Sequence, residues 1–166
     1  MEYARQAGDR ICVESELGVI AGVEDDINSE IEIQSGYDEA IKFLNAADVD
    51  AFAPAIGTAH GFYTKEVDIN YQLVRKLSAN TDVPIVVHGG TGLTPEQFSQ
   101  LIECGASKIN VSTALKKAYF DATKSFFEKA QNSYNPIELD RSVNESMKNI
   151  VEEHIRWFGA EGKENE

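Results

Sequence analysis

The stretch that most constrains the fold is residues 84–92, which read Pro-Ile-Val-Val-His-Gly-Gly-Thr-Gly. Its apolar run, residues 85–87, predicts a buried strand, and the glycines after it allow backbone amides to approach a ligand closely. A helix is predicted directly afterwards, because Thr94 suits the N-cap and Pro95 the first helical position. His88, a side chain of metal-ligand type, therefore stands at the carboxyl end of a strand, beside a loop suited to anions.

The same order of strand, turn and helix recurs four times along the chain. The predicted strands are residues 11–13, 49–55, 85–87 and 108–111, and the predicted helices are residues 38–47, 70–78, 95–104, 114–130 and 141–158. Such alternation is typical of parallel βα units. We therefore expect an α/β fold of four parallel βα units over residues 1–158, the second half of a (β/α)8 TIM barrel, since a whole barrel takes about 250 residues. Residues 159–166 are predicted to be a polar C-terminal tail.

Charge and composition exclude several classes of partner. The chain has 15 Lys and Arg against 28 Asp and Glu, a net charge of −13, which argues against nucleic acid and anionic membranes. No run of 18 apolar residues exists, so no membrane span is expected. Cys12 and Cys104 lack Cys-x-x-Cys spacing and stand in apolar surroundings, which favours two buried, reduced thiols in a cytoplasmic protein. Because the net charge is strongly negative, any phosphate site must be built locally, from helix N-termini and backbone amides.

Two histidines occupy equivalent places after neighbouring predicted strands. His60 follows Gly57-Thr58-Ala59 and His88 follows the strand at residues 85–87, and each is followed by glycine. Imidazole is the commonest metal ligand, and a catalytic zinc takes three protein ligands and leaves one position open. We expect the two histidines to share an ion. The alternative is that each only makes hydrogen bonds within its own loop.

Two further features supply candidate acids. Glu14 and Glu16 alternate along the first strand, so they face the same side, and a metal or a histidine there would offset the cost of burying them. Solvated acids at a strand end are the equally open alternative. Residues 21–36 are predicted to be a long loop, whose Glu24-Asp25-Asp26 run is either solvated surface or the source of a mobile acid that closes over a substrate.

Two strand-to-helix turns predict an anion site. They are Gly89-Gly90-Thr91 and Asn110-Val111-Ser112-Thr113, and each combines backbone amides with a helix N-terminus. Because the carboxyl ends of parallel strands meet at one edge, these turns and the histidines should lie together. This arrangement indicates a phosphorylated substrate whose other end reaches a metal.

At these residues the sequence resembles the class II, zinc-dependent fructose-bisphosphate and tagatose-bisphosphate aldolases. The matching pieces keep their order and are residues 13–18, 22–26, 55–61, 87–92 and 108–113. The resemblance implies cleavage of a ketose bisphosphate, with dihydroxyacetone phosphate as one product, at a zinc ion. It further implies roles for the following residues: zinc ligands His60 and His88, with Glu16 approaching zinc in some states; the mobile acid Glu24; and substrate-binding Gly61, Gly89, Gly90, Thr91, Asn110, Val111, Ser112 and Thr113.

The resemblance also carries expectations about cofactors and partners. Gly61 and Gly89 are expected to help hold a monovalent cation, Na⁺ or K⁺. The family's third zinc histidine and an adjacent aspartate have no counterpart in this sequence, so activity is expected to require a chain that supplies the first half of the barrel. The open edges of a half barrel favour pairing with such a chain or with another copy. The alternative is a catalytically inactive remnant, or a metal- and phosphate-binding module that forms oligomers through those edges.

Overall fold

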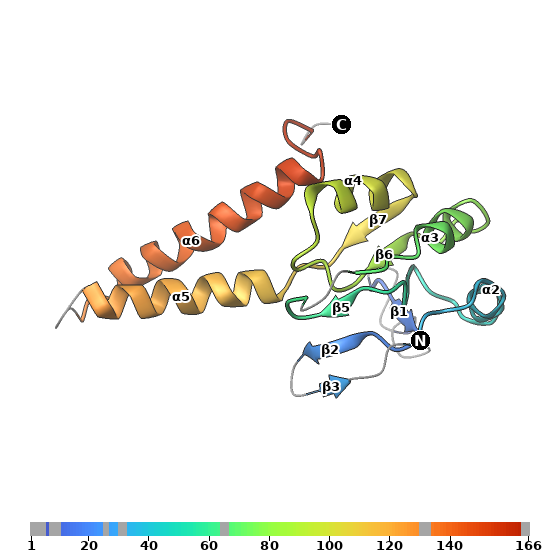
Figure 1. Cartoon of the computed structure of the whole chain (residues 1–166), viewed down its shortest axis with the longest axis horizontal. Coiled ribbons are helices and arrows are strands. Elements are labelled where there is room, and N and C mark those ends of the chain that lie inside the picture. Colours follow the sequence, from blue (N-terminus) through green and yellow to red (C-terminus); the bar gives the residue numbers. More distant parts are fainter. Residues whose placement is uncertain are drawn as a thin grey trace. The chain divides into compact units, whose positions relative to one another are not determined.

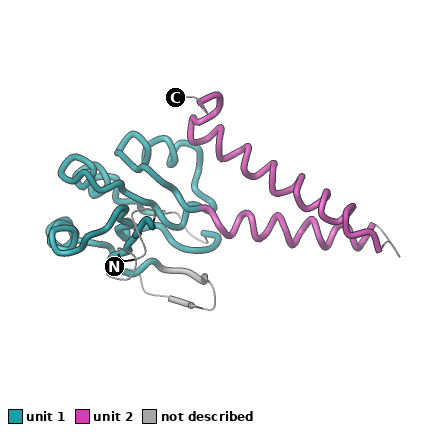
Figure 2. The backbone as a smooth tube through the Cα atoms, turned by 180° about the vertical axis from the view of Figure 1, so that it is seen from behind, with its two compact units in different colours: residues 1–110 teal, residues 111–166 magenta. Residues whose placement is uncertain are grey.

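The computed structural model describes residues 6, 11–24, 27–29, 33–63, 67–129 and 134–163. The chain divides into two compact units, residues 1–110 and residues 111–166 (Figure 2). The first unit contains both sheets, and the second consists of two long helices. The predicted domain over residues 1–158 and tail from residue 159 stay predictions. None of the helices in the described part of the chain has the length and apolar character that a membrane span requires.

The first unit is built on a four-stranded parallel sheet in the order β1-β4-β6-β7 (Figure 1). Its strands are β1 (Glu14–Leu17), β4 (Ala51–Pro54), β6 (Ile85–Val87) and β7 (Ala106–Ile109). The predicted α/β class with four parallel strands is therefore confirmed. The first predicted strand was placed too early, at residues 11–13, where Cys12 is exposed rather than buried.

Three helices alternate along the chain with the strands of this sheet: α2 (Tyr37–Ala46), α3 (Tyr71–Ser78) and α4 (Pro95–Glu103). Helix α3 contacts α2 and α4 and lies against β6. Helix α4 begins with a full capping box, in which the side chains of Thr94 and Gln97 each accept a hydrogen bond from the other's backbone amide. Apolar spacing in the sequence predicts that Phe98, Leu101 and Ile102 face inward; Phe98 and Leu101 are indeed buried, whereas Ile102 is 37% exposed. The turn chemistry of the sequence thus sets where this helix begins.

The two faces of the sheet differ in the size of their side chains. On one face Phe52 is fully buried and stacks on Phe43 of α2, with ring centroids 5.6 Å apart. On the other face the strand register pairs Glu14 with Ala51 and Glu16 with Ala53. The alanines on this second face are small enough to leave room above β4 for longer side chains from the neighbouring strands. The charged residues of the site come from this second face.

A second sheet of three strands, in the order β3-β2-β5, replaces part of the predicted loop at residues 21–36. Strands β2 (Ala21–Glu24) and β3 (Ile27–Ser29) pair antiparallel, and β2 also pairs parallel with β5 (Ala59–His60). In this register Gly22 stands opposite His60. The segment expected to be a loop is therefore anchored by its backbone to the strand that carries a candidate metal ligand.

The second unit consists of α5 (Thr113–Lys129) and α6 (Pro136–Trp157), which pack along each other (Figure 1). Ala118 and Val143 are buried between them. Helix α6 begins earlier than the predicted residue 141, because Asn135 caps it by accepting a hydrogen bond from the amide of Ile137. Proline at position 136 suits the first helical turn, which needs no amide donor there.

Candidate metal centre

Three predicted ligands come together at the carboxyl end of the sheet. Glu16, His60 and His88 each offer one ligand atom, and these atoms all lie within 4.8 Å of one another. The rings of His60 and His88 are stacked with centroids 5.9 Å apart. The convergence of the two histidines, predicted from their equivalent places after strands, is thus found in the structure.

The donor set fits a zinc ion. Zinc binds imidazole nitrogen and carboxylate oxygen at about 2.0–2.2 Å, so tetrahedral ligand atoms stand about 3.4 Å apart. Ligand atoms within 4.8 Å of one another reach such spacing through side-chain movements of about 1 Å. Nδ1 of His88 already lies 2.9 Å from Oε2 of Glu16. Two nitrogens and one oxygen also leave a fourth position for a substrate or water.

Glu14 lies on the far side of the His88 ring. Its Oε1 is 2.9 Å from Nε2 of His88, and its Oε2 accepts a hydrogen bond from Nζ of Lys108 at 2.7 Å. Burial raises the pKa of the Glu14 carboxyl, but the hydrogen bonds and charges of Lys108 and His88 outweigh burial, so this pKa lies below its ordinary value. Glu14 is therefore a carboxylate at neutral pH, which resolves the question left open for it in favour of a histidine partner.

Tyr63, which the sequence did not single out, joins the two histidine loops. Its hydroxyl donates to the carbonyl of Gly89 at 2.5 Å and accepts from the amide of Ala59 at 3.1 Å. The loops also touch directly, since Gly89 has φ +74° and a Cβ there would stand 2.5 Å from the carbonyl oxygen of Ala59. Only a residue without a side chain allows this approach. Together these contacts fix the spacing of His60 and His88.

Among the predicted substrate-binding residues, the turn at residues 89–91, Asn110 and Gly61 lie in the first unit. The amide of Gly90 donates to the carbonyl of Asn110 at 2.9 Å, and the amide of Asn110 donates to the carbonyl of Val87 at 2.8 Å. Thr91 is buried, with 3% of its surface exposed. Gly61 directly follows β5 with φ +100° and open space around it. The turn at residues 89–91 and Asn110 therefore lie side by side, as predicted from the parallel strands.

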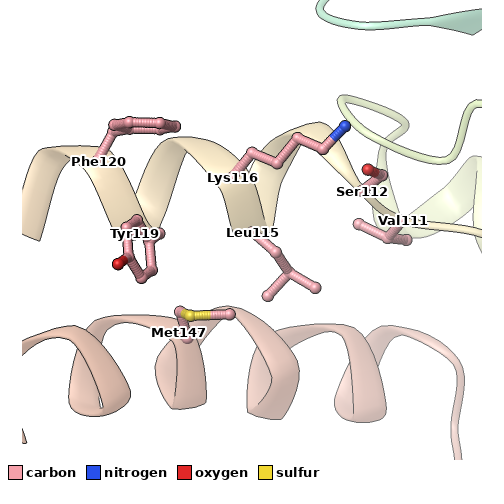
Figure 3. Close-up of a pocket in the computed structure, with 7 residues that line it drawn as sticks. All are labelled: Val111, Ser112, Leu115, Lys116, Tyr119, Phe120 and Met147. Atoms are coloured by element: carbon pink, nitrogen blue, oxygen red, sulfur yellow. The ribbon is translucent and has the colours of Figure 1, made fainter. Parts of the chain in front are cut away.

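The remaining site residues fall in other parts of the structure. Glu24 is the last residue of β2, and its side chain lies outside the described part of the structure. Val111, Ser112 and Thr113 belong to the second unit, where Thr113 begins α5. Val111 and Ser112 line a groove of about 410 Å³ whose other walls come from α5 and Met147 of α6 (Figure 3). Most of its lining side chains are apolar or aromatic, and Ser112 and Lys116 add a hydroxyl and an ammonium group.

Comparison with known proteins decides the family. A sequence profile described as "Fructose-bisphosphate aldolase class-II" matches residues 1–163. The chain belongs to this family. It is 35% identical over 163 residues to a fructose-bisphosphate aldolase of Geobacillus stearothermophilus, covering 98% of this chain and 56% of that protein. It is 33% identical over 153 residues to the D-tagatose-1,6-bisphosphate aldolase subunit GatY of Klebsiella oxytoca, covering 91% of this chain and 54% of that one.

Solved structures agree with this assignment. The crystal structure of the YdjI aldolase from Escherichia coli K12 matches with a TM-score of 0.77 and 30% sequence identity, covering 98% of this chain and 54% of that one. The chain thus spans about half the length of the relatives it matches. The curved four-stranded sheet corresponds to half of a TIM barrel, as the count of βα units predicted.

Proposed function

We propose that this chain takes part in the zinc-dependent, reversible aldol cleavage of fructose- or tagatose-1,6-bisphosphate to dihydroxyacetone phosphate and glyceraldehyde 3-phosphate. The observation that carries this proposal is the convergence of Glu16, His60 and His88 within 4.8 Å at the carboxyl end of a parallel sheet. That edge is where βα folds place their chemistry. Zinc held there supplies a Lewis acid that polarises the carbonyl of the phosphorylated ketose.

The chain's own residues then bind and orient the substrate. Gly61, Gly89 and Thr91 present backbone amides and a hydroxyl near the histidines, and Asn110 stands beside them. Because the amide of Gly90 donates to Asn110, Gly90 acts in this proposal as the link between the two turns rather than as a phosphate donor. Val111, Ser112 and Thr113 keep their predicted part in anion binding, through the N-terminus of α5.

Glu24 is proposed to move the proton. It stands two residues beyond Gly22, whose backbone pairs with His60, so its strand reaches the rim that carries the metal ligands. In the condensation direction, a carboxylate beside bound dihydroxyacetone phosphate would accept a proton from the hydroxyl-bearing carbon next to the carbonyl, and in cleavage it would return that proton to the same carbon after the C–C bond has broken. General acid–base catalysis of this kind contributes about 10²–10⁴-fold to the rate.

Further predictions about partners accompany this function. We infer that a second copy, or a chain supplying the other half of the barrel, pairs with the open edges of the sheet, because unpaired strand edges favour such pairing. A cytoplasmic location and a monovalent cation, Na⁺ or K⁺, beside Gly61 and Gly89 stay predictions. The carbonyl of Gly89 accepts from Tyr63 and keeps a second lone pair for such an ion.

The test measures metal content and aldol cleavage of both bisphosphates, for the chain alone and mixed with the first-half segment of a relative. We expect about one zinc per chain, lost in His60→Ala and His88→Ala, and retained in His154→Ala, whose imidazole lies in α6. Cleavage should appear in the mixture and disappear on chelation. Zinc binding without cleavage in either preparation would instead support the inactive, metal-binding alternative. Unchanged zinc content in both histidine variants would refute the metal centre.

A further inference from the structure

The ring of His88 stands between two carboxylates that occupy different positions. Nδ1 faces Oε2 of Glu16 at 2.9 Å, and Nε2 faces Oε1 of Glu14 at 2.9 Å. Glu16 belongs to the group whose ligand atoms converge with those of His60, whereas Glu14 does not. The nitrogen that points toward the metal position is therefore Nδ1, and the nitrogen that points away from it is Nε2.

Both oxygens of Glu14 are already engaged. Oε1 meets His88, and Oε2 accepts from Nζ of Lys108 at 2.7 Å. A carboxylate held between two partners in this way has a fixed orientation, and most of the Glu14 side chain is shielded from solvent, since its exposed fraction is 25%. Glu14 and Glu16 stand two residues apart on one strand, yet Glu16 belongs to the group of candidate metal ligands and Glu14 binds His88 and Lys108.

Lys108 reaches Glu14 across the width of the sheet. Glu14 lies on β1 and Lys108 on β7, the two outermost strands. Three strand spacings separate them, about 14 Å in a flat sheet, which is too far for a direct contact of two side chains. The contact exists because the sheet curves as half a barrel does and because Ala51 and Ala53 on the intervening β4 are small. The ion pair therefore depends on the curvature that also brings the metal ligands together.

We propose that Glu14, held in place by Lys108, is a positioning residue for metal binding by His88. An ionised carboxylate only accepts hydrogen bonds, so Glu14 keeps a proton on Nε2 and leaves the lone pair of Nδ1 directed at the ion. Lys108 acts through Glu14 and does not touch the metal. This inference rests on the proposed function in one respect, namely that Glu16, His60 and His88 bind a metal.

The experiment measures the Zn²⁺ affinity of the full chain by competition with a chromophoric chelator. Glu14→Ala and Lys108→Met are expected to weaken zinc binding about 10–100-fold, the usual effect of losing the hydrogen-bond partner of a ligating histidine. Glu14→Gln should lose less, because its amide oxygen still accepts from Nε2, and Lys108→Arg should restore most of the affinity. Glu103→Gln and Lys42→Met change the same charges at exposed positions and serve as matched controls.

A double-mutant cycle separates positioning from a general loss of charge or stability. If Lys108 acts through Glu14, then Lys108→Met has no further effect in the Glu14→Ala background. The visible spectrum of Co²⁺-substituted protein gives a second readout, and it should change in Glu14→Ala but not in the controls. Circular dichroism checks that each variant folds. If Glu14→Ala does not fold, Glu14→Gln replaces it as the background in which Lys108→Met is tested.

The outcomes distinguish this inference from the proposed function. Zinc binding by the unaltered chain, together with affinities of Glu14→Ala and Lys108→Met within about twofold of the controls, would overturn the positioning role alone. Equal effects of Lys108→Met in both backgrounds would show that Lys108 acts independently of Glu14 and would overturn the relay. No zinc binding by the unaltered chain would refute the proposed function, and the positioning role would fall with it.

Discussion

Replacing Gly89 by alanine should separate the two loops that carry the histidines. Gly89 has φ +74°, and a Cβ there would lie 2.5 Å from the carbonyl oxygen of Ala59 and 2.8 Å from its carbonyl carbon. Since both atoms belong to the backbone, no side chain can rotate away to relieve the overlap. The carbonyl group of Ala59 must move, and the adjacent His60 moves with it.

Gly89→Ala is expected to lower the free energy of unfolding for two reasons, and a control variant separates the two contributions. A left-handed conformation at a residue with a side chain costs about 1–2 kcal/mol. Overpacking against a rigid neighbour adds about 1–3 kcal/mol. Gly61 has φ +100°, and a Cβ added there would meet nothing within 4 Å, so Gly61→Ala should lose only the first part. Gly89→Ala should therefore lower the free energy of unfolding by about 2–5 kcal/mol, and Gly61→Ala by about 1–2 kcal/mol.

Urea denaturation followed by circular dichroism measures both costs. With a slope of about 2 kcal/mol per molar urea, Gly89→Ala should lower the midpoint by about 1–2.5 M and Gly61→Ala by about 0.5–1 M. Equal midpoints for the two variants would show that the contact with Ala59 does not constrain the loops, and the account of their spacing would be wrong.

Four further substitutions test other parts of the first unit by the same denaturation assay. Tyr63→Phe removes both hydrogen bonds between the histidine loops and should cost about 1–3 kcal/mol; a cost below about 0.5 kcal/mol would contradict the linking role. Phe52→Ala should cost about 3–5 kcal/mol, because the ring is fully buried, whereas Ile102→Ala, at a 37% exposed position, should cost clearly less. Thr94→Ala removes one half of the capping box and should cost about 1 kcal/mol.

The sequence predicts the fold well wherever local chemistry decides the structure. Apolar runs and the Thr94-Pro95 pair identify β6 and α4 nearly to the residue. The first strand is misplaced because Ile11, Cys12 and Val13 form a better strand by composition than the acidic segment after them. The acids are accommodated in β1 because His88 and Lys108 are their partners, and these partners are distant in the sequence.

The candidate site shows the same division. His60, His88 and Gly89 could be predicted, because their residue types and their positions after strands are visible in the sequence. Lys108 and Tyr63 could not, because a lysine in a short strand and a tyrosine after a glycine turn are ordinary residues. Their roles arise from the curvature of the sheet and from the approach of two loops, which are tertiary properties. One pattern could have indicated Lys108: it is a basic residue on the last predicted strand, and the first strand carries two acids, Glu14 and Glu16.

The charges around the centre lead to a last prediction, that metal binding strengthens substrate binding. Glu14 and Glu16 against Lys108 leave one net negative charge, in a chain whose overall charge is −13. A divalent ion reverses the local sign. One unit charge acting over about 10 Å at an effective dielectric constant of about 20 contributes about 1.7 kcal/mol, so dihydroxyacetone phosphate should bind at least about tenfold more tightly to the zinc-loaded chain than to the chelated chain. Calorimetric titration of both forms measures this difference. Equal affinities would mean that the phosphate binds without help from the metal, and would refute the charge effect predicted here.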